Sequence, residues 1–171
     1  MTLGLAPVLD FDGTLTHLEV DWVGLRQQLG VERIDDLWWQ KYNWEEVTEA
    51  EVRAAETAEL ITPVAAKLLT INSFAILTSN SSDAVHRFLE RFPLLEQRLA
   101  IVVGRDELGG PKTEFDSFRV GVTKCLTATH PVGNGEQTTY LGDSPFELDF
   151  ARRLGLKVLD VSQLTGIETE K

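Results

Sequence analysis

Residues 5–16 read LAPVLDFDGTLT, an apolar run that leads into two aspartates and a glycine. The apolar part has the length of a strand and no polar alternation, as expected for a strand buried on both faces of a sheet. A glycine after the second aspartate permits a sharp turn with exposed backbone N–H groups. We therefore predict that residues 5–11 form a buried strand, which brings Asp10 and Asp12 to the edge of a sheet.

Apolar runs of strand length recur along the rest of the chain, and amphipathic helical patterns separate several of them. The runs occupy residues 74–78, 100–103, 138–141 and 156–161, and the helical patterns occupy residues 82–92, 115–126 and 145–154. Alternating strands and helices predict an α/β fold, a Rossmann-like three-layer sandwich with a mainly parallel sheet. In such sheets the reactive site lies at the carboxyl ends of the strands.

One segment interrupts this alternation, because it contains helical patterns but no convincing strand. The helical patterns lie at residues 21–29, 34–42 and 45–60. We therefore predict two parts: an α/β core formed by residues 1–15 and 61–171, and a small helical cap, residues 16–60, inserted over the active edge. The acidic residues between 45 and 59 are predicted to form a solvated helix face.

All four tryptophans of the chain lie in this insert, at positions 22, 38, 39 and 44. They could pack the insert's own core, close over a substrate, or join a second subunit. Because Trp38 and Trp39 are adjacent, they cannot both face one side of a helix. We expect one of them to meet a partner or a pocket.

Composition narrows the class of protein further. The chain has 171 residues, enough for one domain with a core, and its net charge of -11 argues against a nucleic-acid partner. No apolar run approaches the ~20 residues that a membrane span needs, so no membrane association is expected. The opening residues also lack a basic region before their apolar run, which disfavours a secretory signal. A single Cys125 cannot form an internal disulfide, so the cytoplasm is the expected compartment.

The two aspartates of the first motif are the strongest chemical signal. Carboxylates two residues apart at the end of a strand would repel each other unless a cation lies nearby. Together with the turn at Gly13, which suits an anion, the arrangement favours a divalent cation and an anionic substrate. The alternative is a solvated turn without a function.

Three later segments also carry candidate groups at predicted strand or helix ends. Thr78, followed by Ser79 and Asn80, could bind a phosphate oxygen or merely cap the helix that follows. Lys112 follows Gly-Gly-Pro and could point inward or remain exposed in a loop. Asp143, in the sequence LGDSP, has the hard oxygen ligands that suit Mg²⁺.

Taken in this order at strand ends, the four motifs resemble those of the haloacid dehalogenase-like (HAD) superfamily, whose first motif is DxDGT[LV]. The resemblance implies that Asp10 is a nucleophile that becomes an aspartyl-phosphate, and that Asp12 is the general acid and base. It implies that Lys112 neutralises the phosphate and the nucleophile. The substrate phosphate would be held by Gly13, Thr78, Ser79, Asn80 and Lys112, with Thr78 the first choice of hydroxyl and Ser79 the alternative.

The same resemblance implies a Mg²⁺ cofactor. Its ligands would be Asp10, the backbone carbonyl of Asp12, Asp143 and Glu147. The family usually has an aspartate four residues after the first acidic residue of this motif, where this chain has Glu147 and, two residues further on, Asp149. Glu147 could instead be a first-turn acid that stabilises its helix.

The function that the resemblance implies is removal of phosphate from a small phosphorylated metabolite, with phosphoglycolate-phosphatase-like members as the nearest branch. Asp12 favours phosphate chemistry because the dehalogenases of the superfamily lack this second aspartate. The alternatives are a phosphomutase that uses the same site, or a weakly active HAD-fold binding or regulatory protein. The sequence makes no prediction of the oligomeric state.

Overall fold

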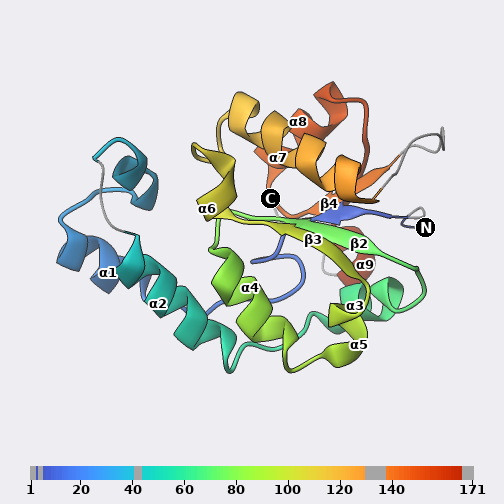
Figure 1. Cartoon of the computed structure of the whole chain (residues 1–171), viewed down its shortest axis with the longest axis horizontal. Helices are drawn as coiled ribbons and strands as arrows, with labels where there is room; N and C mark the ends of the chain where they lie inside the picture. The colour runs from blue at the N-terminus through green and yellow to red at the C-terminus, as the bar shows by residue number, and fades with distance from the viewer. Residues whose placement is uncertain (1–2, 4–5, 41–43, 130–137, 167–171) are drawn as a thin grey trace.

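A five-stranded sheet forms the centre of the computed structural model, which describes residues 3, 6–40, 44–129 and 138–166 (Figure 1). The strands are β1 (Val8–Leu9), β2 (Phe74–Leu77), β3 (Leu99–Val103), β4 (Thr139–Gly142) and β5 (Lys157–Asp160). They lie in the order β3-β2-β1-β4-β5, and every neighbouring pair is parallel. The predicted α/β Rossmann-like fold is therefore confirmed.

Helices cover both faces of this sheet (Figure 1). One face carries α6 (Arg105–Leu108), α7 (Phe115–Thr129) and α8 (Pro145–Arg153), and the other carries α3 (Thr62–Leu68), α4 (Ser82–Leu89), α5 (Pro93–Glu96) and α9 (Ser162–Thr165). Adjacent residues of β1 serve the two layers: Val8 packs in the core under α7 and α8, whereas Leu9 packs in the core under α3 and α4. Both are fully buried, which explains why the strand sequence shows no polar alternation.

The central strand is shorter than residues 5–11. Residues 4 and 5 lie outside the described part, and Pro7 has no N–H to donate to a neighbouring strand. The carbonyl of Pro7 still accepts a hydrogen bond from the Ala75 amide at 3.0 Å, and the Asp10 amide donates to the Leu141 carbonyl at 2.9 Å. Asp10 is therefore anchored to β4 as it leaves the sheet, where β1 lies between β2 and β4 and the strand order reverses.

Three helices that follow β1 form an arm beside the sheet. They are α1 (Trp22–Leu29), the 3₁₀ helix η1 (Ile34–Trp38) and α2 (Glu45–Ala55). α2 packs along α4, so the arm extends the α4 side of the molecule (Figure 1). The arm has a small apolar core of its own, formed by Leu25, Leu29, Leu37 and Val47. In the described residues, no helix is long and apolar enough to cross a membrane.

The two ends of the predicted cap lie side by side, because Thr16 and Leu60 form an antiparallel bridge. The division into a core and a cap at these residues stays a prediction. Two helices of the arm are shorter than predicted: η1 ends at Trp38, with residues 41–43 outside the described part, and α2 ends at Ala55 rather than continuing to residue 60.

Candidate active site

The site begins at Asp10, which is buried at the end of β1. The Lys112 ammonium donates to Asp10 Oδ1 at 2.6 Å, and the Phe11 amide donates to the same oxygen at 2.8 Å. Lys112 reaches this point from the loop before α7, and it also donates to the Leu77 carbonyl at the end of β2 at 3.3 Å. The structure therefore brings together the predicted nucleophile and the predicted lysine.

Lys112 is shared between two carboxylates. Its ammonium lies 2.9 Å from Glu147 Oε2, and the Tyr140 hydroxyl donates to the same oxygen at 2.5 Å. Burial alone would lower the pKa of Lys112, but the charges of Asp10 and Glu147 raise it above its ordinary value, so the ammonium stays charged. Burial raises the pKa of Glu147 to about 7, although the nearby Lys112 opposes this shift.

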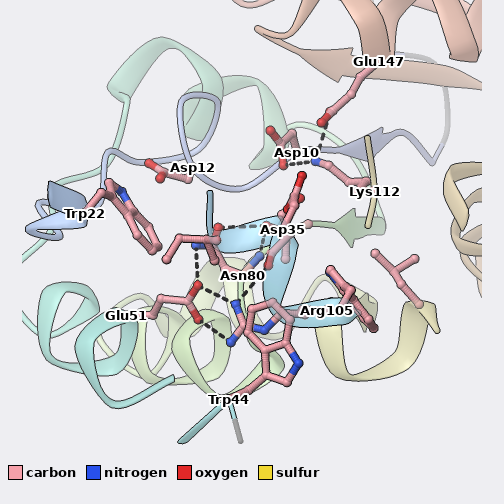
Figure 2. A pocket seen from close by; sticks show the side chains of 15 residues that line it. Asp10, Asp12, Trp22, Asp35, Trp44, Glu51, Asn80, Arg105, Lys112 and Glu147 are labelled. Carbon is pink, nitrogen blue, oxygen red and sulfur yellow. Dashed lines mark hydrogen bonds and ion pairs between the residues drawn. The ribbon is translucent and has the colours of Figure 1, made fainter. Parts of the chain in front are cut away.

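Glu147 is thus a partner of Lys112, as Figure 2 shows, and of Tyr140. It is buried in the first turn of α8, so the alternative interpretation, a first-turn acid that stabilises its helix, stays open. Asp149, the second candidate, is exposed. The metal-binding role of Glu147 stays a prediction.

Asp12 lies two residues beyond Asp10 and is half-buried. The Leu18 amide donates to its Oδ1 at 2.9 Å and fixes the orientation of the carboxyl group. Burial, followed by the charge of Asp10, raises the pKa of Asp12 above its ordinary value. A carboxyl group with a raised pKa is suited to give up a proton and take one back near neutral pH.

Gly13 brings the fourth motif against the first. Its φ of +82° lies in the left-handed region, and a β-carbon here would overlap the carboxylate of Asp143. Asp143 therefore lies directly against the turn that follows Asp12. Partial burial and then the charge of Asp10 raise the pKa of Asp143, so these carboxylates repel one another as they stand.

The second motif forms the loop between β2 and α4. Thr78 is buried; its hydroxyl donates to Asn80 Oδ1 at 2.9 Å and accepts from the Asn80 amide at 3.1 Å. Ser79 is exposed, while Ser81 caps α4 by accepting the Ala84 amide at 3.3 Å. Ser81 is thus the capping residue, and Thr78, Ser79 and Asn80 line the pocket. Their role in phosphate binding stays a prediction.

These residues line a pocket of about 300 Å³ between the sheet edge and the helical arm (Figure 2). The predicted site residues that line it are Asp10, Asp12, Thr78, Ser79, Asn80, Lys112 and Glu147. Gly13 and Asp143 are not among the residues that line it; Asp143 is exposed and lies against Gly13. The opposite wall comes from the arm and includes Trp22, Trp38 and Trp44.

The wall also contains a buried ion pair that the sequence analysis missed. The Arg105 guanidinium, at the start of α6, donates to both carboxylate oxygens of Glu51 on α2, at 2.8 and 3.0 Å. Glu51 also accepts from the Asn80 side-chain amide at 3.2 Å and from the Ser81 amide at 2.9 Å. Arg105 donates to the Ser79 carbonyl at 3.2 Å. The ion pair therefore holds the loop between β2 and α4: Glu51 binds Asn80 and Ser81, and Arg105 binds Ser79.

The prediction that the acidic stretch 45–59 is a solvated helix face is wrong at Glu51, whose side chain is only 1% exposed. The charge is compensated in full by Arg105 and two amide donors, which makes its burial possible. A signal was present in the sequence: Val47, Glu51 and Ala55 are spaced four residues apart and share the buried face of α2. Arg105 carries no comparable signal.

The donor set around Asp10 suits a divalent cation. Asp10, Asp12 and Asp143 are hard oxygen donors, and their mutual repulsion would be relieved by a positive charge between them. Within the described part of the chain, no three acidic, histidine or cysteine side chains form a ready-made metal cage. The predicted ligand set of Asp10, the Asp12 carbonyl, Asp143 and Glu147 stays a prediction; water and substrate would supply the other ligands.

Comparison with known protein families supplies the identity of the fold. The sequence model of haloacid dehalogenase-like hydrolases matches residues 33–161, about three quarters of the chain. The chain belongs to the haloacid dehalogenase-like hydrolase family. The match starts after the first motif, so the assignment of Asp10 and Asp12 within this HAD fold depends on the motif itself and on the geometry described above.

Solved structures show the same HAD fold at low sequence identity. A HAD-family enzyme from Bacteroides thetaiotaomicron is 15% identical, with 92% of this chain and 93% of that chain covered and a TM-score of 0.61. The L-2-haloacid dehalogenase of Xanthobacter autotrophicus is 19% identical, with 92% and 76% covered and a TM-score of 0.57. The UTR4 protein of Saccharomyces cerevisiae is 14% identical, with 90% and 88% covered and a TM-score of 0.55. A comparison with curated protein sequences finds no match.

Proposed function

We propose that this HAD-family hydrolase is a Mg²⁺-dependent phosphatase, a phosphoric monoester hydrolase that acts on a small phosphorylated metabolite through an aspartyl-phosphate intermediate. The observation that carries the proposal is the contact between Lys112 and Asp10 at 2.6 Å, at the bottom of a pocket that also contains Asp12. A buried lysine beside a carboxylate nucleophile can hold the phosphate of a substrate and stabilise the charge that develops during transfer.

The two donors on Asp10 distinguish its oxygens. Lys112 and the Phe11 amide both bind Oδ1, so we assign the attack to Oδ2. Oδ2 forms a bond to phosphorus, the bond between phosphorus and the ester oxygen breaks, and the alcohol leaves with a proton from Asp12. In the second step Asp12 takes a proton from water, the water oxygen attacks phosphorus, and Asp10 is released with inorganic phosphate.

The second aspartate supports phosphate chemistry over dehalogenation. Its raised pKa favours the protonated form that the first step requires. The dehalogenases of the superfamily lack this residue, although one of them shares the fold. Thr78, Ser79 and Asn80 line the same pocket as Lys112, whose ammonium contacts the carbonyl of the preceding residue Leu77, and we propose that they supply further contacts to phosphate oxygens.

A Mg²⁺ ion held by Asp10, the Asp12 carbonyl and Asp143 would supply charge neutralisation for the phosphoryl group. The chain's own residues then orient the phosphate, exclude water from the buried side of Asp10 and move the proton. We keep the cytoplasm as the expected compartment, because the buried thiol of Cys125 is the only cysteine of the chain.

The proposal is tested with p-nitrophenyl phosphate and Mg²⁺. Wild-type protein is expected to release p-nitrophenol, chelation by EDTA to abolish the release, and Asp10→Asn to lower it by about 10⁴-fold or more. The matched control is Asp116→Asn, because this aspartate lies on the surface of α7 with a side chain that is 84% exposed. Turnover that survives Asp10→Asn would overturn the assigned nucleophile.

A further inference from the structure

The wall opposite the catalytic residues is aromatic. Trp22 begins α1, Trp38 ends η1 and Trp44 precedes α2, and all three line the same pocket as Asp10 and Lys112. Figure 2 shows Trp22 and Trp44. The rings of Trp38 and Trp44 meet edge to face at 5.3 Å, which holds both side chains in place. The alcohol part of a substrate bound at Asp10 would extend toward these indoles.

The charges in the pocket are unequal. Among the described residues that line it, the two cations are Lys112 and Arg105, and both are already paired with carboxylates. Asp35, in η1, adds a further carboxylate to the wall. Its contacts are the Thr113 hydroxyl at 3.1 Å and Arg33 at 3.5 Å, and the Arg33 side chain is 70% exposed, so solvent screens that pair.

The chain already places a cation on one of these indoles. The Arg105 guanidinium lies 4.4 Å from the centre of the Trp44 ring and is balanced by the Glu51 carboxylate. A cation over a tryptophan face with a carboxylate beside it is therefore an arrangement that this wall supports. Trp22, Trp38 and Asp35 line the same pocket, and none of the three is paired with a cation from the described lining residues.

From this juxtaposition we infer that the substrate is the phosphate ester of an alcohol that carries a compact positive charge, an alkylammonium group. The ammonium contacts Trp22 and Trp38, and Asp35 supplies the opposite charge. The inference rests on the proposed phosphatase function and names its substrate class. A carboxylate at the same place, as in phosphoglycolate, would face Asp35 and find both described lining cations occupied.

The test compares three phosphate esters under the same conditions: phosphocholine, its uncharged isostere 3,3-dimethylbutyl phosphate, and phosphoglycolate. Phosphocholine is expected to have a kcat/KM about tenfold above the isostere, since the two differ only in charge, and to exceed phosphoglycolate by more. Equal or lower kcat/KM for phosphocholine than for the isostere would overturn the inference. A higher kcat/KM for phosphoglycolate than for phosphocholine would also overturn it, because the pocket would then prefer a negative charge.

Two pairs of variants locate the effect. Asp35→Asn is expected to bring the ratio of phosphocholine to isostere close to one, whereas Asp36→Asn, whose side chain accepts the Arg33 amide outside the pocket, should keep it. Trp38→Leu is expected to lower the same ratio, whereas Trp39→Leu should not, because Trp39 is 68% exposed. Ratios that do not change in Asp35→Asn and Trp38→Leu would contradict the assigned residues.

The two proposals fail in different ways. If p-nitrophenyl phosphate is hydrolysed in an Asp10-dependent manner but phosphocholine has no advantage, the phosphatase proposal stands and the substrate class is wrong. If no phosphate ester is hydrolysed, the phosphatase proposal fails. Binding to Asp10→Asn protein, followed by tryptophan fluorescence, then tests the cation site by itself: phosphocholine is expected to bind about tenfold more tightly than the isostere, and equal binding would overturn it.

Discussion

Two buried ion pairs, Glu51–Arg105 and Asp10–Lys112, line one pocket (Figure 2). They differ in how many carboxylate oxygens accept hydrogen bonds. Glu51 and Arg105 share two hydrogen bonds; Glu51 also accepts from Asn80 and Ser81, and Arg105 also donates to Ser79 and Thr48. Lys112 instead bridges Asp10 and Glu147 through one oxygen of each. The saturated pair can only hold its neighbours, whereas the open pair can exchange a partner for a phosphate oxygen.

The difference follows from where the side chains originate. Asp10 is held at the carboxyl edge of the sheet by the pairing of β1 with β2 and β4, while Lys112 reaches it from the loop before α7 and Glu147 from the first turn of α8. Glu51 belongs to the arm and Arg105 to the core, so their pair joins two parts of the chain that are far apart in sequence. We expect the first pair to control chemistry and the second to control structure.

Breaking the saturated pair should have the largest effect on stability. Arg105→Met leaves Glu51 buried without its cation, and the free energy of unfolding is expected to fall by about 3–5 kcal/mol. Urea denaturation measures this change. The double variant Glu51→Met/Arg105→Met removes both charges and should recover a large part of the loss, while Arg87→Met, on the exposed face of α4, should change little. A loss of less than about 1 kcal/mol in Arg105→Met would contradict the prediction, because it would show that Glu51 does not depend on Arg105 for compensation of its charge.

Breaking the open pair should act on catalysis. Lys112→Met is expected to lower kcat/KM for p-nitrophenyl phosphate by about 10²–10³-fold, because the charge that stabilises the transferring phosphoryl group is lost. Steady-state kinetics provide the measurement. Lys124→Met is the control, since this lysine donates to the Glu107 carbonyl on the exposed side of α7. A fall of only a few fold would remove Lys112 from the catalytic assignment.

The open pair should also make stability depend on pH. Burial raises the pKa of Glu147 to about 7 from an ordinary value of 4.5, so the native state binds more protons than the unfolded state between these values. Stability therefore falls as pH rises from about 4.5 to 7, by about 1–3 kcal/mol. Denaturation in EDTA measures the slope. Glu147→Gln should reduce the dependence of stability on pH. An unchanged pH dependence in this variant would show that other titratable groups cause it.

A smaller effect is expected at the turn after Asp12. Gly13→Ala and Gly30→Ala both place an alanine in the left-handed region, which costs about 1–2 kcal/mol in each. Only at Gly13 would the new β-carbon meet Asp143; at Gly30 it would meet open space. Activity should therefore fall in Gly13→Ala alone. Equal activity in the two variants would show that the position of Asp143 is unimportant.

The sheet and its carboxyl edge were predictable because strand-length apolar runs mark them. The motif at Asp10 ends the first run, Thr78 ends the second and Asp143 follows the fourth, and a parallel sheet necessarily gathers such ends. Lys112 was predicted from the family pattern rather than from its own surroundings. Its contact with Glu147 was not predicted, because a contact between a loop residue and a helix 35 positions later has no periodic signal in the sequence.

The arm was less predictable. Helix periodicity indicated α1 and α2, but the burial of Glu51 depends on Arg105, which lies 54 positions away in the sequence. The tryptophans illustrate the same limit. Because Trp38 and Trp39 are adjacent, the sequence showed that they cannot face the same side of a helix, and the structure places Trp38 in the pocket and Trp39 in solvent. Composition alone could not choose between them.

The central claim is that Asp10 becomes phosphorylated, and the most direct measurement is a rapid acid quench with a ³²P-labelled phosphate ester. The account predicts a hydroxylamine-sensitive label on the peptide that contains Asp10, formed faster than inorganic phosphate is released and lost in Asp10→Asn. Phosphate release without any labelled protein, or a label on another residue, would contradict it.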